Sequence, residues 1–283
     1  MSERGRDGGT KGRSDGGKKI PPRGARADAW AFVASALPET VVPLVAPAEF
    51  LEAAAGLGVE FEAGEVERLG LYLALLIEAN KSVNLTGVTE PAEAWRRHIL
   101  DSLTLLPMLA ELGEGAEGAG GARVIDVGSG GGLPGVPLAI VMPGVRFTLL
   151  EATGKKAEFL RAAAARLGLK NVEVVAERAE AAGHDPRHRE RYDAAVARAV
   201  GPTAVIAELT VPFARIGGGR VLLIKGQKAE EELAAAKAAL HKLHAVHVGT
   251  VETPNGRVVV LEKRRRTPAA YPRRAGEPKL RPL

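Results

Sequence analysis

The chain has 283 residues, of which 46% are apolar and 4% aromatic, so it can form one large domain or two around a core of Leu, Val and Ala. It has no cysteine, which excludes disulfides, thiolate metal sites and a cysteine nucleophile. No apolar run approaches the roughly 18 residues that would cross a bilayer, and the N-terminus lacks the hydrophobic region of a signal peptide. We therefore expect a cytoplasmic protein.

The net charge of +5 is unevenly distributed. Residues 1–28 carry eight Lys/Arg and four Asp/Glu, and residues 263–283 carry eight Lys/Arg and one Glu, which leaves a net charge of −6 on the part between them. An acidic body with basic ends indicates a polyanionic partner such as nucleic acid. For residues 1–28, a solvated and solubilising extension is the simpler interpretation.

Residues 1–28 contain almost no large apolar side chain and are predicted to be disordered. Residues 29–112 have a helical pattern and are expected to form a small N-terminal helical subdomain. Residues 80–87 are predicted to be a polar turn within it, rich in side chains that cap backbone groups. Residues 113–121, rich in Gly and Glu, are predicted to be a flexible linker.

Two apolar stripes carry the helical prediction. The first has side chains at i, i+3, i+7, i+10 and i+11, and these are Val66, Leu69, Leu73, Leu76 and Ile77. The second consists of Trp95, Ile99, Leu103 and Leu106. On the opposite side of the second helix, Arg97 and Asp101 are expected to form an i, i+4 ion pair.

Strands and helices alternate over residues 122–263, which predicts a mainly parallel sheet with helices on both faces. The expected strands are 123–127, 146–150, 172–176, 194–198, 220–224, 245–251 and 258–263, and the expected helices lie near 135–142, 155–167, 202–214 and 229–243. The last two strands flank Pro254-Asn255-Gly256 and should form an antiparallel hairpin. Such an ending is typical of S-adenosylmethionine (SAM) methyltransferases and not of dinucleotide-binding domains. Residues 264–283 are predicted to be a basic tail, extended and without a core.

A strand that runs straight into a glycine-rich loop is the strongest single feature, and it reads Val124-Ile125-Asp126-Val127-Gly128-Ser129-Gly130-Gly131-Gly132-Leu133-Pro134-Gly135. Such a loop lies at the carboxyl edge of a parallel sheet, where open α/β folds bind ligands. Gly130, Gly132 and Gly135 fit the dinucleotide pattern, which is weak alone. Asp126 followed by Gly128, Gly130 and Gly132 fits the acid-x-G-x-G-x-G pattern of SAM methyltransferases. A tight turn without a ligand is the third interpretation.

Side chains after the other strands complete the candidate site. Glu151 follows the second strand, about 20 residues past the loop, where an acid can accept hydrogen bonds from ribose hydroxyls of NAD or SAM; a helix N-terminal acid is the alternative. Thr153 is expected to cap the next helix. Ala179 and Glu180 should face an adenine edge after the third strand, and Arg198 should lie at the reactive end. Lys225 points to the same crevice, either to hold a phosphate or as a solvated lysine.

The absence of two sequence features limits which methyl-transfer reactions the chain could catalyse. The fourth strand is not followed by the Asn-Pro-Pro-Tyr or Asp-Pro-Pro-Tyr pattern of exocyclic-amine methylation, and without cysteine a covalent pyrimidine adduct is excluded. A nucleophile with its own lone pair, such as guanine N7, requires no deprotonation, so positioning dominates and no catalytic side chain is predicted. His98 with Asp101 is expected to be structural or to line the site. Metal binding by His184 and His188 is not expected.

Several segments, in this order, resemble the glucose-inhibited division protein B (RsmG) family of small-subunit rRNA guanine-N7 methyltransferases. They are Asn84-Leu85-Thr86, Arg97-His98-Ile99-Leu100-Asp101-Ser102-Leu103, the glycine loop, Leu150-Glu151-Ala152-Thr153-Gly154-Lys155-Lys156, Ala197-Arg198-Ala199, Ile224-Lys225-Gly226 and Tyr271-Pro272-Arg273-Arg274-Ala275-Gly276-Glu277-Pro278. The resemblance covers about residues 50–283 and implies a class I SAM-methyltransferase Rossmann-like fold, with a mainly parallel seven-stranded sheet that ends in an antiparallel hairpin.

The resemblance implies SAM-dependent N7-methylation of guanine 527, in the 530 loop of 16S rRNA. By motif it places Gly128 and Leu133 at the cofactor, Glu151, Ala152 and Thr153 at its ribose, Ala179 and Glu180 at its adenine, and Arg198 near the reactive end. Two departures are visible. The loop reads Gly-Ser-Gly-Gly-Gly where the family has Gly-Thr-Gly-Pro/Ala-Gly, and Glu151 replaces the usual Asp.

The expected partner is 16S rRNA, the 30S subunit or an assembly intermediate, bound by Arg96, Arg97, Lys225 and the basic tail, with the protein as a monomer and without a metal or a membrane. Three alternatives share parts of these features. A methyltransferase for another RNA or a small molecule would have the same SAM site. An NAD(P)-dependent oxidoreductase would share the glycine loop, and a non-catalytic RNA-binding protein would share only the basic ends.

Overall fold

The computed structural model describes residues 37–38, 40–113, 121–198 and 201–283. Its centre is a seven-stranded sheet in the order β3-β2-β1-β4-β5-β7-β6. The strands are β1 (Arg123–Val127), β2 (Arg146–Leu150), β3 (Val172–Val175), β4 (Ala194–Arg198), β5 (Arg220–Lys225), β6 (Ala245–Thr253) and β7 (Gly256–Lys263). The first five are parallel, and β7 pairs antiparallel with both β5 and β6. The predicted sheet with its terminal hairpin is confirmed.

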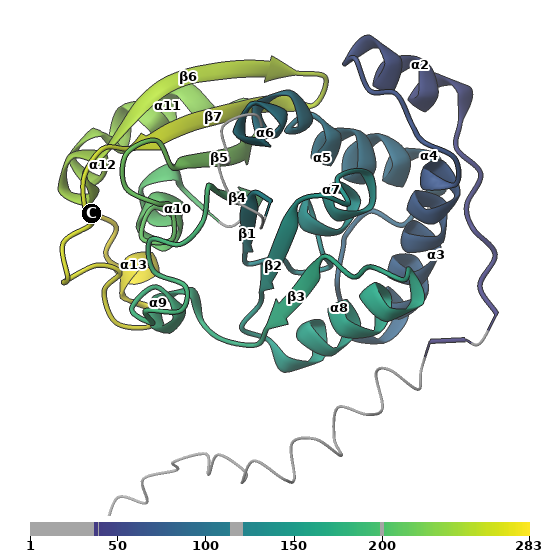
Figure 1. Ribbon diagram of the computed structural model, residues 1–283, viewed down its shortest axis with the longest axis horizontal. Helices are drawn as coiled ribbons and strands as arrows, with labels where there is room; N and C mark the ends of the chain where they lie inside the picture. The colour runs from purple at the N-terminus through teal and green to yellow at the C-terminus, as the bar shows by residue number, and fades with distance from the viewer. Residues whose placement is uncertain (1–36, 39, 114–120, 199–200) are drawn as a thin grey trace, which may run out of the picture.

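The central strands are buried on both faces because their apolar residues alternate between two cores. In β5, Val221 and Leu223 pack into one cluster, whereas Leu222 and Ile224 pack into the other. The period of two places successive side chains on opposite faces of the sheet, and helices cover both faces (Figure 1). The run of β-branched and aliphatic residues is thus explained by two-sided burial.

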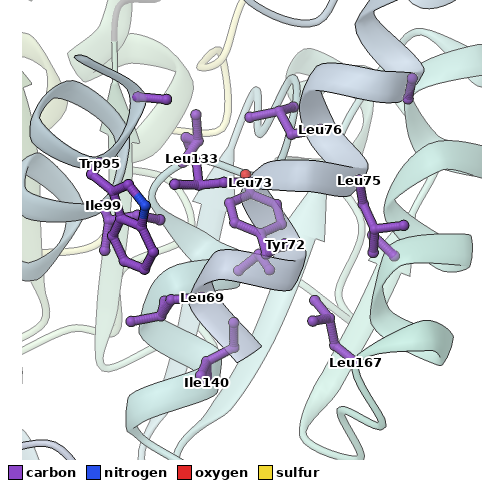
Figure 2. Packing of buried hydrophobic residues seen from close by; sticks show 14 of the residues in the cluster. Leu69, Tyr72, Leu73, Leu75, Leu76, Trp95, Ile99, Leu133, Ile140 and Leu167 are labelled. Atoms are coloured by element: carbon purple, nitrogen blue, oxygen red, sulfur yellow. The ribbon is translucent and has the colours of Figure 1, made fainter. Parts of the chain in front are cut away.

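The N-terminal helices and two helices of the sheet domain cover one face of the sheet, where most of them share one core, while Met108 and Leu109 belong to a neighbouring cluster on the same face. Their bounds are α2 (Ala48–Gly56), α3 (Glu65–Val83), α4 (Pro91–Ala94), the π-helix η1 (Trp95–Leu100), α5 (Asp101–Leu103), α6 (Leu106–Gly113), α7 (Gly135–Val141) and α8 (Gly154–Arg166). The predicted stripe on α3 is confirmed, with Leu69, Leu73 and Leu76 fully buried. Figure 2 shows Tyr72 and Leu73 of α3 beside Leu133, which follows the glycine loop.

The other face is covered by α9 (Ala179–Ala182), α10 (Thr203–Thr210), α11 (Ala229–Ala235), α12 (Lys237–Leu243) and α13 (Glu277–Leu280). The prediction of an extended tail without a core is wrong. Residues 264–283 fold back, Thr267, Pro272 and Pro278 are buried, and Arg273 pairs with the fully buried carboxylate of Glu208 at 2.6 Å. The sequence alone does not reveal this packing, because each contact joins residues far apart in the chain.

Several local predictions need correction. The described chain has no helix between 40 and 47, and α3 continues to Val83, so the expected turn is confined to its last part. The hairpin turn is Pro254–Asn255, since Thr253 pairs with Gly256. A Cβ on Gly256 would lie 2.2 Å from the carbonyl oxygen of Lys225, so the glycine is required by the close approach of β5. Residues 1–28 and most of the predicted linker lie outside the described residues.

Candidate functional site

The glycine loop folds against the end of β2 because its glycines adopt backbone angles that other residues avoid. Gly128, Gly130 and Gly132 have φ of 74°, 57° and 98°, which is the left-handed region. The amides of Gly128 and Ser129 both donate to the carbonyl oxygen of Leu150, at 2.8 and 3.1 Å. The loop therefore lies directly beside the carboxyl ends of β1 and β2.

Glu151 joins this loop to the start of α8. One carboxylate oxygen accepts a hydrogen bond from the Gly130 amide at 3.0 Å, and the other accepts one from the Thr153 amide at 2.6 Å. Thr153 occupies the N-cap position of α8, as predicted, but its side chain makes no capping hydrogen bond, and its own amide is held by Glu151 instead. A carboxylate has about four lone-pair sites, so two remain for a ligand.

Helix α3 supports the loop from the other side, a contact that was not predicted from the sequence. The hydroxyl of Tyr72 donates to the carbonyl oxygen of Gly131 at 2.8 Å, and the Tyr72 side chain is completely buried. A Cβ on Gly131 would lie 2.7 Å from Leu76 Cδ1. A buried Tyr in an apolar stripe needs a partner for its hydroxyl, and that is the one signal in the sequence that could have indicated this contact.

Asp126 lies beneath the loop as a fully buried carboxyl. Its Oδ2 accepts from the Gly135 amide at 3.0 Å, whereas its Oδ1 has no hydrogen-bond partner among the described residues. Burial raises the pKa of Asp126 to about 7, against the opposing effects of the Gly135 amide, Ser129 and Arg198. A Cβ on Gly135 would lie 2.8 Å from Oδ2, so this contact requires glycine.

We expect Asp126 to couple stability to pH. Its ordinary pKa is 3.8, so between about pH 4 and pH 7 the folded chain keeps a proton that the unfolded chain releases. The contribution of this carboxyl to the free energy of unfolding therefore falls as the pH rises through that window. Urea unfolding at pH 5 and pH 8 measures this effect. From pH 5 to pH 8 the free energy of unfolding should fall by more in the wild type than in Asp126→Asn. Equal losses would contradict the assigned pKa. The lowered pKa of His98 makes its contribution to the free energy of unfolding rise with pH over the same range. This contribution is the same in both proteins, so it cancels in the comparison.

The remaining predicted cofactor residues lie along the same sheet edge. Ala152 and Thr153 follow β2, and Ala179 and Glu180 open α9 just after β3. Leu133 is 6% exposed and belongs to the core shared with α3. The Glu180 carboxylate accepts from the Gly276 amide at 2.7 Å, so this side chain is bound to the C-terminal tail. The cofactor contacts of these residues stay a prediction.

A cleft of about 570 Å³ lies beside the carboxyl ends of β4 and β5, lined among others by Thr86, Arg97, His98, Asp101, Arg198, Lys225 and Asn255. Arg198 donates to the Arg97 carbonyl oxygen at 2.6 Å and lies 3.3 Å from His98 Nδ1. His98 Nε2 lies 2.8 Å from the Thr86 hydroxyl. Burial, assisted by the Arg198 charge, lowers the pKa of His98 to about 4, so the ring is neutral. Both of its nitrogens have partners, Thr86 and Arg198.

Asp101 and the hairpin meet in this cleft. The side-chain amide of Asn255 donates to Asp101 Oδ1 at 2.8 Å and to the Arg96 carbonyl oxygen at 3.0 Å. Asp101 Oδ2 lies 3.9 Å from Arg198, and burial raises the pKa of Asp101 above its ordinary value. The role of Asn255 was not predicted, because nothing in its local sequence indicates that the hairpin turn reaches η1.

Other predictions for this region are corrected. Arg97 does not pair with Asp101 but with Glu93 at 3.8 Å, since the π-helical turn changes which side chains share a face. Lys225 is neither solvated nor free for a phosphate, because its ammonium donates to the Gly201 carbonyl oxygen at 2.7 Å and pairs with Glu232. His184 and His188 bind the Pro272 carbonyl oxygen and the Tyr192 hydroxyl, respectively.

The site fits a nucleoside cofactor on the evidence of its own geometry. A Cβ on Gly130 would meet only the Gly128 carbonyl oxygen, at 3.8 Å, so the space above the loop is open. Beside it, Glu151 is 7% exposed and keeps acceptor capacity. Among the residues that the structure describes, no helix has the length and apolar character to span a bilayer. The sheet order, the antiparallel β7 and this site define a class I SAM-dependent methyltransferase.

Comparison with known proteins identifies the family. The family model of rRNA small subunit methyltransferase G matches residues 65–260. Ribosomal RNA small subunit methyltransferase G of Sorangium cellulosum is 51% identical over 232 residues, which are 82% of this chain and 94% of that protein. The protein of the same name from Rubrobacter xylanophilus is 45% identical over 238 residues, 80% and 87% of the two chains. The chain therefore belongs to the rRNA small subunit methyltransferase G family.

Among solved structures, a mutant of MtNAS in complex with S-adenosylmethionine is 17% identical, with a TM-score of 0.47 over 86% of this chain and 92% of that chain.

Proposed function

We propose that this enzyme transfers a methyl group from SAM to N7 of guanine 527 in the 530 loop of 16S rRNA. The proposal rests on family membership together with one observation: His98, the histidine that lines the cleft at β4 and β5, is neutral and has both ring nitrogens occupied, so it is not available as a general base. It includes a monomer that works in the cytoplasm on 16S rRNA, the 30S subunit or an assembly intermediate. A methyltransferase acting on another RNA or a small molecule is the alternative.

The proposed chemistry needs no general base. SAM supplies an electrophilic methyl group on a sulfonium, and guanine N7 has a lone pair that needs no deprotonation. His98 is neutral, and its two ring nitrogens are occupied by Thr86 and Arg198, so it positions groups and does not move protons. The contribution of this chain is then to hold the base in line and to exclude water.

In this proposal Gly128, Leu133, Glu151, Ala152, Thr153, Ala179, Glu180 and Arg198 form the cofactor site. Glu151 would accept hydrogen bonds from the ribose hydroxyls, in addition to those from Gly130 and Thr153. Arg198 joins this site to the cleft, because its charge acts on both Asp126 and Asp101.

Asp101 is expected to select guanine. Guanine presents two neighbouring donors, N1–H and the 2-amino group, which match one carboxylate. We expect Asp101→Asn to lower kcat/KM about 30-fold, or about 2 kcal/mol, with unchanged SAM affinity. A substrate with inosine at the target position lacks the 2-amino group, so it should slow the wild type much more than the variant. Equal effects of inosine on both proteins would contradict this assignment.

The position is tested in rRNA from a strain that lacks the gene. Chemical cleavage at 7-methylguanosine should reveal a strand break at guanine 527 only after the wild-type gene is restored. A break at another guanine would refute the position, and the absence of any 7-methylguanosine that depends on the gene would refute the proposed function.

A further inference from the structure

A second concave surface lies at the opposite edge of the sheet, where β1 and β2 begin. Two hollows of about 550 and 450 Å³ share Arg146, Lys170 and Asn171 in their walls. Arg68 of α3 lines the first hollow and Arg123 of β1 lines the second. Five residue steps separate Arg146 from Glu151, so this surface is about 16 Å from the cofactor site along β2. We call Arg68, Arg123, Arg146 and Lys170 with these hollows the basic groove.

The cations of the basic groove lack counter-ions. In the described ranges, the side chains of Arg68, Arg146 and Lys170 form no ion pair and no hydrogen bond. The Arg123 guanidinium lies 4.9 Å from the centre of the Tyr192 ring. The first hollow has no acidic residue in its wall, and the second has one, Glu173, which forms no ion pair with these cations in the described part of the chain. Three positive side chains line each hollow and repel each other, so their gathering is not explained by folding.

The backbone beneath these cations is held in place. The side-chain amide of Asn171 donates to the carbonyl oxygens of Ala139 at 3.0 Å, Met142 at 3.2 Å and Val145 at 3.0 Å. It thereby ties the loop between α7 and β2 to the turn that carries Lys170. The positions of Arg146 and Lys170 are therefore preorganised, which lowers the entropic cost of binding a ligand.

The spread of the cations favours an extended polyanion over a single small anion. They come from α3, β1, β2 and the turn before β3, and so follow the sheet edge. The one aromatic side chain in the groove wall, Phe147, is 1% exposed, so no ring is free to stack on a base. Phosphate contacts from Arg and Lys position a nucleic acid without reading its sequence.

We propose that the basic groove binds backbone phosphates of a second segment of the ribosomal RNA, remote from the methylated guanine. This inference rests on the proposed function. An RNA segment that enters the cleft at β4 and β5 lies at the other edge of the sheet, so only a folded RNA that passes around the protein reaches both places. The substrate is therefore a large folded rRNA domain, and a short hairpin of the target loop leaves the groove empty.

The test compares two variants with the same change in net charge. Arg146→Glu/Lys170→Glu reverses two exposed cations of the groove, and Lys237→Glu/Lys242→Glu reverses two exposed cations on α12. Binding of full-length 16S rRNA and of a short target-loop hairpin is measured over a range of salt concentrations, together with SAM affinity as a check on folding. Each lost phosphate contact lowers the slope of log K against log salt by about 0.7 to 0.9.

For the groove variant we expect at least a tenfold loss of affinity for full-length rRNA and a slope that is less steep by about 1.5. Its affinity for the hairpin and for SAM should stay at the wild-type value, and the α12 variant should change neither RNA. Equal losses for hairpin and full-length rRNA, equal losses in both variants, or no loss at all would overturn the proposal. Failure of the wild type to methylate rRNA would refute the proposed function instead, since binding is measured independently.

Discussion

Glu151→Ala is expected to weaken SAM binding by about 100-fold or more. A hydrogen bond to a charged acceptor contributes about 1.5–3 kcal/mol, and the carboxylate would lose two bonds to the ribose, which together amount to at least about 3 kcal/mol. The glycine loop would also lose the acceptor that holds the Gly130 amide at 3.0 Å. Isothermal titration calorimetry with SAM measures the effect directly.

Glu151→Asp is the matched control for this change. It keeps the carboxylate and shortens the side chain by one methylene, so it should retain SAM affinity within about tenfold, because charge and both acceptor oxygens remain. If alanine and aspartate at this position bound SAM as tightly as the wild type does, the ribose contact would be wrong. Loss of binding in the aspartate variant as complete as in the alanine variant would show that the reach of the side chain matters more than its charge.

Arg273→Ala is expected to lower the free energy of unfolding by about 3 kcal/mol. Glu208 is completely buried on α10, and the Arg273 guanidinium supplies three hydrogen bonds to its carboxylate. Removing one partner of a buried ion pair leaves an uncompensated charge in the core and costs about 3–5 kcal/mol. The Arg273 amide, 2.8 Å from Oε1, remains in the variant and keeps the loss near the lower value.

The neighbouring Arg274 provides the control, since it is exposed and Arg274→Ala should change stability by no more than about 0.5 kcal/mol. Urea unfolding of the two variants under identical conditions makes the comparison. Similar stabilities would show that the tail does not depend on the Glu208 pair. Because this pair anchors residues 264–283, deleting the tail would disturb the fold, and rate changes in such a deletion would not report on RNA binding.

The sheet and the glycine loop could be predicted because their signals are local. Strand-length apolar runs such as Val221–Ile224, separated by helical patterns, determine an alternating fold, and positive φ at Gly128, Gly130 and Gly132 explains why the loop needs glycine. The acid after β2 was also predictable, because Glu151 follows β2, the glycine loop follows β1, and these two strands are parallel neighbours in the sheet. Strand ends shifted by one or two residues, as at Val175 and Thr253.

The remaining parts of the site, and the packing of the C-terminal tail, depend on contacts between distant segments. Asn255 reaches Asp101 across 154 positions, Tyr72 reaches Gly131 across 59, and Arg273 reaches Glu208 across 65. No periodicity or turn signal indicates such contacts. Lys225 illustrates the consequence: its place at the end of β5 was predicted, but its ion pair with Glu232 depends on how α11 packs.

Methyl transfer from isotopically labelled SAM to 16S rRNA purified from a strain lacking the gene tests the central claim most directly. The purified protein should transfer one methyl group per rRNA molecule, nucleoside analysis should find the label in 7-methylguanosine, and Glu151→Ala at the same SAM concentration should transfer almost none. Label on any other nucleoside, or equal transfer by the wild type and Glu151→Ala, would contradict the account.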